Sequence, residues 1–228
     1  MDLLKYIFSL SLVLISVSFC FGQEENLYAP KEEKVPLVLK GIKLGVNVGR
    51  FTDFQFKPER FSYEASLDFN LSNKYYGIIE AGYSEIDLKK ENYNYSSEGN
   101  FYKIGMDYNM LKKQPSDYLG MGFRIGRADF TQSANNILIE DDHWPSFTTA
   151  IDSKSYNMYW LEVSFGLKGE LFKNVYLGWA AMVKIRMTGG KDAAFQAYDI
   201  PGFGKGESSI NLGANYYIYY QIPFNRNK

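Results

Sequence analysis

The chain contains one histidine, His143, and its neighbours could take part in acid–base chemistry. His143 follows Asp141 and Asp142 in the sequence EDDHWPS, and Ser146 comes three residues later. An imidazole beside carboxylates can transfer protons, or it can bind a metal ion together with them. A solvated acidic loop turned by Pro145 accounts for the same residues and is the interpretation we favour. We expect no catalytic site and no metal site here, and this group is the single catalytic candidate.

Two glycine-rich stretches have a superficial likeness to nucleotide-binding loops. The run GMGFRIG has glycines at 120, 122 and 126, which is one residue too long for a dinucleotide fingerprint, and no helix is expected after it. Residues 189–206 lack the strand-to-helix context of a phosphate cradle, so we expect them to form a mobile loop. Aromatic side chains of this loop and of its neighbour could form a surface contact patch, or could pack the loops together: Phe195, Tyr198, Phe203 and Trp144.

Charged residues recur at alternate positions within apolar stretches, so they share one face of the strands that carry them. Five are acidic and six are basic: Glu64, Asp68, Glu80, Asp107, Glu162, Lys43, Lys103, Arg124, Lys168, Lys184 and Arg186. If that face lines a narrow barrel, the near balance of charge favours a closed network of ion pairs. The alternative is a narrow path for ions or solutes.

Eight stretches of alternating apolar and polar residues must position these charges. In the first, Ile42 and Leu44 lie opposite Lys43, which is the period of two of a β-strand. The stretches cover residues 40–51, 60–70, 75–84, 102–110, 119–126, 159–168, 175–186 and 209–224. Short connections alternate with long ones, which is typical of a membrane barrel: 71–74, 111–117 and 171–174 are short, and 52–59, 85–100, 127–156 and 187–208 are long.

The alternation alone does not tell which face is wet. A soluble sandwich or a lipocalin-like periplasmic barrel would bury the apolar face and expose the charges. Strands of about ten residues, aromatic side chains at strand ends and glycines on the polar face favour a membrane barrel instead. We therefore predict an all-β fold, an eight-stranded antiparallel up-and-down transmembrane β-barrel over residues 38–228.

The N-terminus has the composition of a secretory signal peptide over residues 1–22. Lys5 precedes an apolar run that ends before a charged stretch, and Cys20 and Gly22 are small enough for a cleavage site. An uncleaved anchor and lipidation at Cys20 are the alternatives. Cleavage after Gly22 would remove the only cysteine. Residues 23–37, which contain two prolines, are expected to form a flexible periplasmic lead-in.

The predicted signal, the eight alternating stretches, the loop rhythm and a last strand that reaches Phe224 (NLGANYYIYYQIPF) resemble small outer-membrane barrels of the OmpA/OmpX type. The use of Tyr, Asn and Lys is also similar to that of uncharacterised barrel families of Bacteroidota. The resemblance implies a location in the bacterial outer membrane and insertion by the barrel-assembly machinery. Pro223 and residues 225–228 depart from a chain that ends in Phe.

We therefore expect a non-enzymatic envelope protein with a charge-filled lumen and extracellular loops that make contacts. Its expected partners are outer-membrane lipids and lipopolysaccharide, the barrel-assembly machinery and an envelope protein, with no cofactor. A formal net charge of −1 gives no field that would attract nucleic acid. The alternatives are a lipid-A-modifying enzyme or protease at the rim, a narrow channel or hydrophobic-ligand conduit, and the soluble periplasmic barrel.

Overall fold

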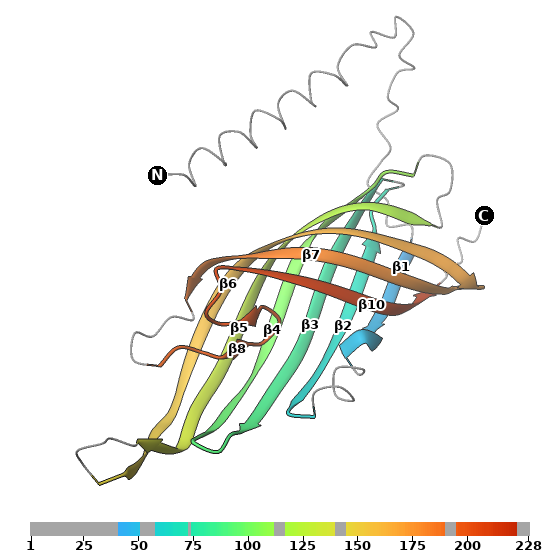
Figure 1. Cartoon of the computed structure of the whole chain (residues 1–228). Coiled ribbons are helices and arrows are strands. Elements are labelled where there is room, and N and C mark those ends of the chain that lie inside the picture. The colour runs from blue at the N-terminus through green and yellow to red at the C-terminus, as the bar shows by residue number, and fades with distance from the viewer. Residues whose placement is uncertain are drawn as a thin grey trace, which may run out of the picture. The chain divides into compact units, whose positions relative to one another are not determined.

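The computed structural model describes residues 41–50, 58–72, 74–111, 117–139, 145–189 and 195–222, and these form a closed antiparallel barrel (Figure 1). Its ring order is β1-β10-β7-β6-β5-β4-β3-β2. The ring strands are β1 (Gly41–Asn47), β2 (Arg60–Asn70), β3 (Tyr75–Lys89), β4 (Asn94–Asn109), β5 (Tyr118–Ile139), β6 (Phe147–Phe172), β7 (Val175–Gly189) and β10 (Ile210–Ile222).

The predicted eight-stranded up-and-down barrel is confirmed, because each strand pairs with its neighbour in sequence and β1 closes the ring with β10. The structure also corrects two predicted loops. Residues 85–100 and 127–156 were expected to be long connections, but most of them belong to β3, β4, β5 and β6. The predicted signal peptide and lead-in lie outside the described residues, and no helix in the described part of the chain is long and apolar enough to cross a membrane.

The alternation continues through these extensions, but its polarity is reversed. On β4, Tyr102 and Ile104 point outward while the next outward residues toward the strand start are Asn100 and Glu98. The inward residue at the change is Phe101, which is fully buried. β5 changes in the same way, from outward Ile125 to outward Arg127. Each long strand therefore has an apolar outside in one half and a polar outside in the other.

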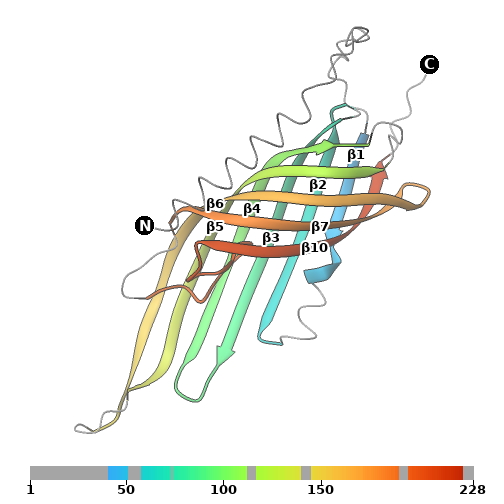
Figure 2. The ribbon, with the colours of Figure 1, turned by 45° about the horizontal axis from the view of Figure 1, so that its top comes forward.

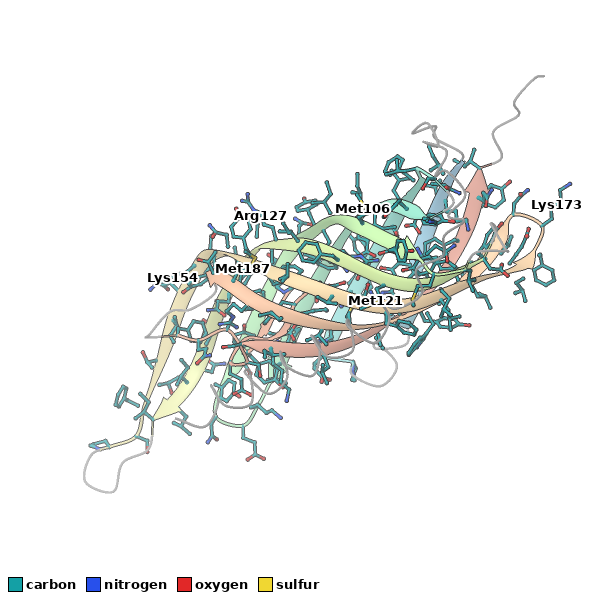
Figure 3. The ribbon with its side chains drawn as sticks, turned by 90° about the horizontal axis from the view of Figure 1, so that it is seen from above. Met106, Met121, Arg127, Lys154, Lys173 and Met187 are labelled. Carbon is teal, nitrogen blue, oxygen red and sulfur yellow. The ribbon has the colours of Figure 1, made fainter. Side chains whose placement is uncertain are left out.

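The apolar outside forms a belt around the ring, which we call the apolar belt. Met106 and Met121 project outward from it (Figure 3), and Ile104 is 63% exposed. Its exposed side chains on other strands include Leu44, Ile79, Phe165, Trp179 and Ile218. A continuous apolar surface on a closed barrel is a lipid-facing surface. The soluble-barrel alternative is wrong, because it requires these side chains to be inside and the charges outside.

The two ends of the barrel differ. Lys173 marks the end with the short turns, and Lys154 marks the opposite end, which we call the outer end (Figure 3). β5 and β6 continue beyond β7 and β10 at the outer end (Figure 2), because the pairing of β6 with β7 stops at Met158↔Gly189 whereas its pairing with β5 continues to Phe147. The outer end is therefore a wall that rises higher on one side.

The connection from β7 to β10 was predicted to be a mobile loop, but residues 195–208 fold into the outer end. They contain a two-stranded sheet of β8 (Asp199–Ile200) and β9 (Gly204–Lys205). Ile200 and Phe203 are buried against β4 and β6 in one hydrophobic cluster. This segment, which we call the inserted segment, is held by burial of its apolar side chains.

Glycines on the inward face leave space for large side chains. The sequence predicts their place on this face, because they alternate with the apolar residues. A Cβ atom at Gly126 would lie 2.1 Å from the Trp160 ring, and one at Gly82 would lie 2.3 Å from the Phe101 ring. Real Cβ atoms do not approach other atoms this closely. The glycines therefore allow Trp160 and Phe101 to fill a narrow interior.

Candidate functional site: the barrel interior and its cover

Lys103 of β4 lies at the centre of the charged side chains inside the barrel. Its Nζ lies 2.7 Å from a Glu64 oxygen, 2.6 Å from a Glu80 oxygen and 3.9 Å from a Glu162 oxygen. These three carboxylates come from β2, β3 and β6, and all four side chains are almost completely buried. One ammonium group thus contacts carboxylates from three strands in a region without bulk water.

Arg124 connects this centre to a second group of charges. Its guanidinium lies 3.4 Å from Glu80 and 3.1 Å from Asp107. Lys168 then lies 3.6 Å from Asp107 and also forms a salt bridge with Asp68. Opposite charges therefore alternate along one connected set of ion pairs, which we call the charged cluster. Its predicted members are Glu64, Asp68, Glu80, Lys103, Asp107, Arg124, Glu162 and Lys168.

Two members of the charged cluster were missed by the sequence analysis. Arg50 forms a salt bridge with Glu64 at 3.0 Å, and the Tyr217 hydroxyl donates a hydrogen bond to the same carboxylate. In a continuous strand Arg50 would have pointed outward, but β1 ends at Asn47 and residues 48–50 are helical, which reverses its direction. Tyr217 has the inward parity of Asn215, so the alternation of the last strand could have identified it.

The three other predicted interior charges have different partners. The Lys43 ammonium lies 3.6 Å from the centre of the Tyr176 ring, as a cation–π contact. Lys184 donates a hydrogen bond of 2.7 Å to the carbonyl oxygen of Gly202. Arg186 donates a hydrogen bond to the carbonyl oxygen of Gly206. Both carbonyls belong to the inserted segment. Lys184 and Arg186 therefore attach that segment to β7.

The outer end of the interior is filled by apolar side chains. Phe203 and Trp160 have ring centres 6.0 Å apart, and Ile200 and Ala128 belong to the same buried cluster. At the edge of this cluster Arg60 of β2 forms a 2.6 Å salt bridge with Asp199. Burial raises the pKa of the Asp199 carboxyl above its usual range, and the Arg60 guanidinium acts in the opposite direction. The inserted segment is therefore fixed by both apolar and ionic contacts.

The end with the short turns is filled by tyrosine rings. Tyr76 and Tyr118 meet edge to face with ring centres 5.9 Å apart, and Tyr217 and Tyr219 stack at 5.2 Å. The Lys168 ammonium lies 4.9 Å from the Tyr219 ring centre, which links these rings to the charged cluster. From one end to the other the interior thus contains tyrosines, ion pairs and an apolar cover.

The predicted aromatic contact patch is only partly at the surface. Phe203 is 1% exposed and packs inside the barrel, so it does not belong to such a patch. Tyr198 is exposed and Phe195 is half-buried, and both line a cavity of about 460 Å³ with Tyr93 and Tyr95. Trp144 lies outside the described residues. We call the cavity at Phe195 and Tyr198 the outer cleft.

The candidate catalytic group cannot be assembled from the described residues. His143, Asp141 and Asp142 lie outside them, whereas Ser146 is exposed just before β6. Within the described part of the chain, no group of three or more His, Cys, Asp or Glu side chains could hold a metal ion. The buried carboxylates of the charged cluster face cations and therefore act as partners of those cations.

Three solved structures of bacterial outer-membrane proteins are similar to the barrel. A major outer membrane protein of Thermus thermophilus is 11% identical with a TM-score of 0.49, over 80% of this chain and 98% of that chain. Ail, the attachment invasion locus protein of Yersinia pestis, is 8% identical with a TM-score of 0.42, over 80% and 97%. The N-terminal β-barrel domain of Pseudomonas aeruginosa OprF is 10% identical with a TM-score of 0.37, over 81% and 98%.

The sequence itself matches no curated protein. It does match a family model over residues 3–227, a range that includes every ring strand and the inserted segment. The match covers almost the whole chain, and the protein therefore belongs to the DUF6048 family, which is described as a domain of unknown function.

Proposed function

We propose that this outer-membrane β-barrel is a non-enzymatic envelope protein with a closed interior, and that its outer end binds the sugars of lipopolysaccharide. The charged cluster then has a structural role, and the outer cleft is the contact site. The proposal treats the outer end as the extracellular end, since long connections and extended strands lie on that side in small membrane barrels.

The observation that carries the closed interior is the lack of space around the charged cluster. The cavity beside Arg124, Glu162 and Lys168 has a volume of about 20 Å³, which holds about one water molecule. The charges on its walls are already neutralised by one another, so an ion that entered would have to replace existing ion pairs. The inserted segment adds an apolar barrier above the cluster, where Phe203 packs on Trp160.

The outer cleft has the composition of a site for a sugar. Tyr93 and Tyr198 offer apolar ring faces together with polar hydroxyl groups, and Phe195 adds a further ring. Tyr95, also in the lining, is buried, and its hydroxyl donates to Gln132. Arg60, Gln196, Lys205 and Glu207 supply polar groups at the same cavity. A concave site with aromatic walls and a few polar groups suits a polar ligand with apolar ring faces.

We expect the purified barrel to give no single-channel current steps in a planar bilayer. The physical reason is the neutralised, tightly filled interior described above. A porin inserted under the same conditions serves as the positive control for detection. Discrete steps of the DUF6048 barrel at neutral pH would contradict the closed interior and favour the narrow-channel alternative.

We expect Tyr198→Ser to weaken binding of lipopolysaccharide by about tenfold, since one exposed aromatic contact contributes roughly 1–1.5 kcal/mol. Binding can be measured by surface plasmon resonance on detergent-solubilised protein. Phe147→Ser is the matched control, because Phe147 is an equally exposed aromatic at the outer end that does not line the outer cleft. Equal weakening by both variants, or by neither, would show that the outer cleft is not the contact site.

A further inference from the structure

The wall of the barrel is incomplete where β1 ends. β1 pairs with β10 only as far as Asn47↔Tyr217, whereas β10 continues along β7 to Ile210↔Ile185. Over residues 210–216, β10 therefore has a strand partner on the β7 side and no strand partner among the described residues on the other side. Leu212 in this stretch is 81% exposed, the largest value among the exposed large hydrophobic side chains of the described chain.

A cavity of about 440 Å³ lies at this break and has two kinds of wall. Asn47, Arg50 and Lys184 reach it from the interior, and Leu212 and Trp179 reach it from the apolar belt. We call it the wall cavity. It is in contact with both the polar interior and the lipid-facing surface, so a molecule with a polar and an apolar part can satisfy both sides.

The polar side of the wall cavity has unused capacity for an anion. Arg50 is neutralised by Glu64 at 3.0 Å and Arg60 by Asp199 at 2.6 Å. Lys184 is buried and forms no salt bridge among the described residues: its hydrogen bond goes to the Gly202 carbonyl oxygen, and the carboxylate opposite it in strand register, Glu162, is an ion-pair partner of Lys103. A buried ammonium group without a direct ion pair costs free energy, and an anion in the cavity would lower that cost.

A second, independent observation points to an acceptor in the same cavity. Asn47 is 1% exposed, and its Nδ2 group has no hydrogen-bond partner among the described residues, while its Oδ1 accepts from the backbone N–H of Tyr216. Buried amide donors in proteins are normally paired, so an unpaired one at a cavity indicates a ligand atom or a water molecule. Among the described residues, the Lys184 ammonium thus lacks a direct ion pair and the Asn47 Nδ2 group lacks a hydrogen-bond acceptor.

The wall cavity also lies near the limit of the apolar belt on the side of the outer end. Strand register places Arg127, Tyr159 and Thr188 side by side, and Arg127 marks the upper limit of the apolar belt on β5. On β7, Lys184 precedes Thr188 by four residues. It therefore lies about two outward side chains inside the limit of the apolar belt. Met187, the last apolar outward residue before Thr188, is 61% exposed (Figure 3).

We propose that the wall cavity binds a phosphorylated membrane lipid, with the phosphate on Lys184 and Asn47 and an acyl chain along Leu212 and Trp179. Phosphate supplies both a direct ion pair for Lys184 and the acceptor that the Asn47 Nδ2 group lacks. A neutral lipid would leave Lys184 without a direct ion pair, and inorganic phosphate would leave the apolar wall uncovered. Arg60 and Asp199 line both the wall cavity and the outer cleft, but Lys184, Asn47, Leu212 and Trp179 do not line the outer cleft, so this proposal does not depend on the function proposed above.

The test uses full-length mature barrel in a nonionic detergent and native mass spectrometry with dioctanoyl phosphatidic acid. We expect a stoichiometric adduct, and Lys184→Gln should weaken its binding about tenfold, the effect of one charge-assisted hydrogen bond. Arg127→Gln is the matched control, since it removes the same charge at the belt edge away from the wall cavity. Heat-modifiable migration on a gel verifies that each variant is folded.

A second variant covers the case in which Lys184→Gln does not fold. Leu212→Asp changes an exposed side chain of the cavity wall and should also weaken the adduct, by removing apolar contact and repelling phosphate. Equal binding of dioctanoyl glycerol, which lacks phosphate, would overturn the proposal. So would equal weakening by Arg127→Gln, or displacement of the lipid by inorganic phosphate at the lipid's own concentration, which would show a site for the free anion.

Discussion

Replacing Lys103 with methionine is expected to lower the free energy of unfolding of the barrel by about 3–5 kcal/mol. Lys103 is completely buried and contacts Glu64 at 2.7 Å and Glu80 at 2.6 Å. Removing one partner of a buried ion pair leaves the other charge without compensation, and that desolvation cost is large. Here one substitution leaves three carboxylates with fewer cations, because Glu162 also faces Lys103.

The measurement is a urea titration of the barrel refolded into lipid vesicles, with the folded fraction read from the heat-modifiable band. Arg127→Met is the control, because Arg127 pairs with Asp129 at the exposed surface and such a pair has little effect on stability. The double variant Lys103→Met with Glu80→Gln should recover part of the loss, since it also removes one uncompensated charge. Unchanged stability of Lys103→Met would mean that the charged cluster is hydrated.

Replacing Phe203 with alanine should make the inserted segment accessible to protease while the barrel stays folded. Phe203 is 1% exposed and packs against Trp160, and removal of a buried phenylalanine ring costs about 3–5 kcal/mol. Lys205 lies two residues away and is exposed, but its backbone pairs with β8. We expect trypsin to cleave after Lys205 at least about 100-fold faster in the variant, because cleavage follows the population of the undocked segment.

Cleavage can be followed by mass spectrometry of fragments, with heat-modifiable migration as the check on the barrel. Glu207→Ala is the control, since Glu207 is an exposed residue of the same segment. It should leave the cleavage rate within about twofold of the wild type. Equal rates for Phe203→Ala and wild type would contradict a docked segment, and loss of the heat-modifiable band would assign Phe203 to the stability of the whole barrel.

Local alternation was sufficient to predict the membrane half of the barrel. The predicted bounds of β2 agree with the structure, and the inward parity of Glu64, Lys103 and Arg124 brings them together in the charged cluster. That parity is a property of the backbone, so it applies to every strand whatever its neighbours are. Local patterning is therefore enough to place these charges inside, although not to pair them.

The outer half could not be predicted in the same way, because its polarity is reversed. On β4, the pattern of apolar outward side chains ends at Phe101. From there toward the strand start the apolar side chain points inward and Glu98 points outward. The inserted segment depends on contacts between Phe203 and Trp160 and between Asp199 and Arg60, which are far apart in sequence. Nothing in the local composition of residues 195–208 indicates these partners.

Along β4 and β5 the outward side chains change from apolar to polar. The length of a strand therefore does not determine the height of the apolar surface that it presents to a bilayer. β5 has 22 residues, but its outward apolar side chains in the apolar belt run from Leu119 to Ile125, and the next exposed ones, Leu138 and Ile139, lie at the far end of the strand. β5 is therefore much longer than the part of the apolar belt that it carries. Lengthening β5 and β6 beyond Arg127 would change how far the wall reaches from the membrane without causing hydrophobic mismatch. In this architecture, reach and membrane fit can evolve independently.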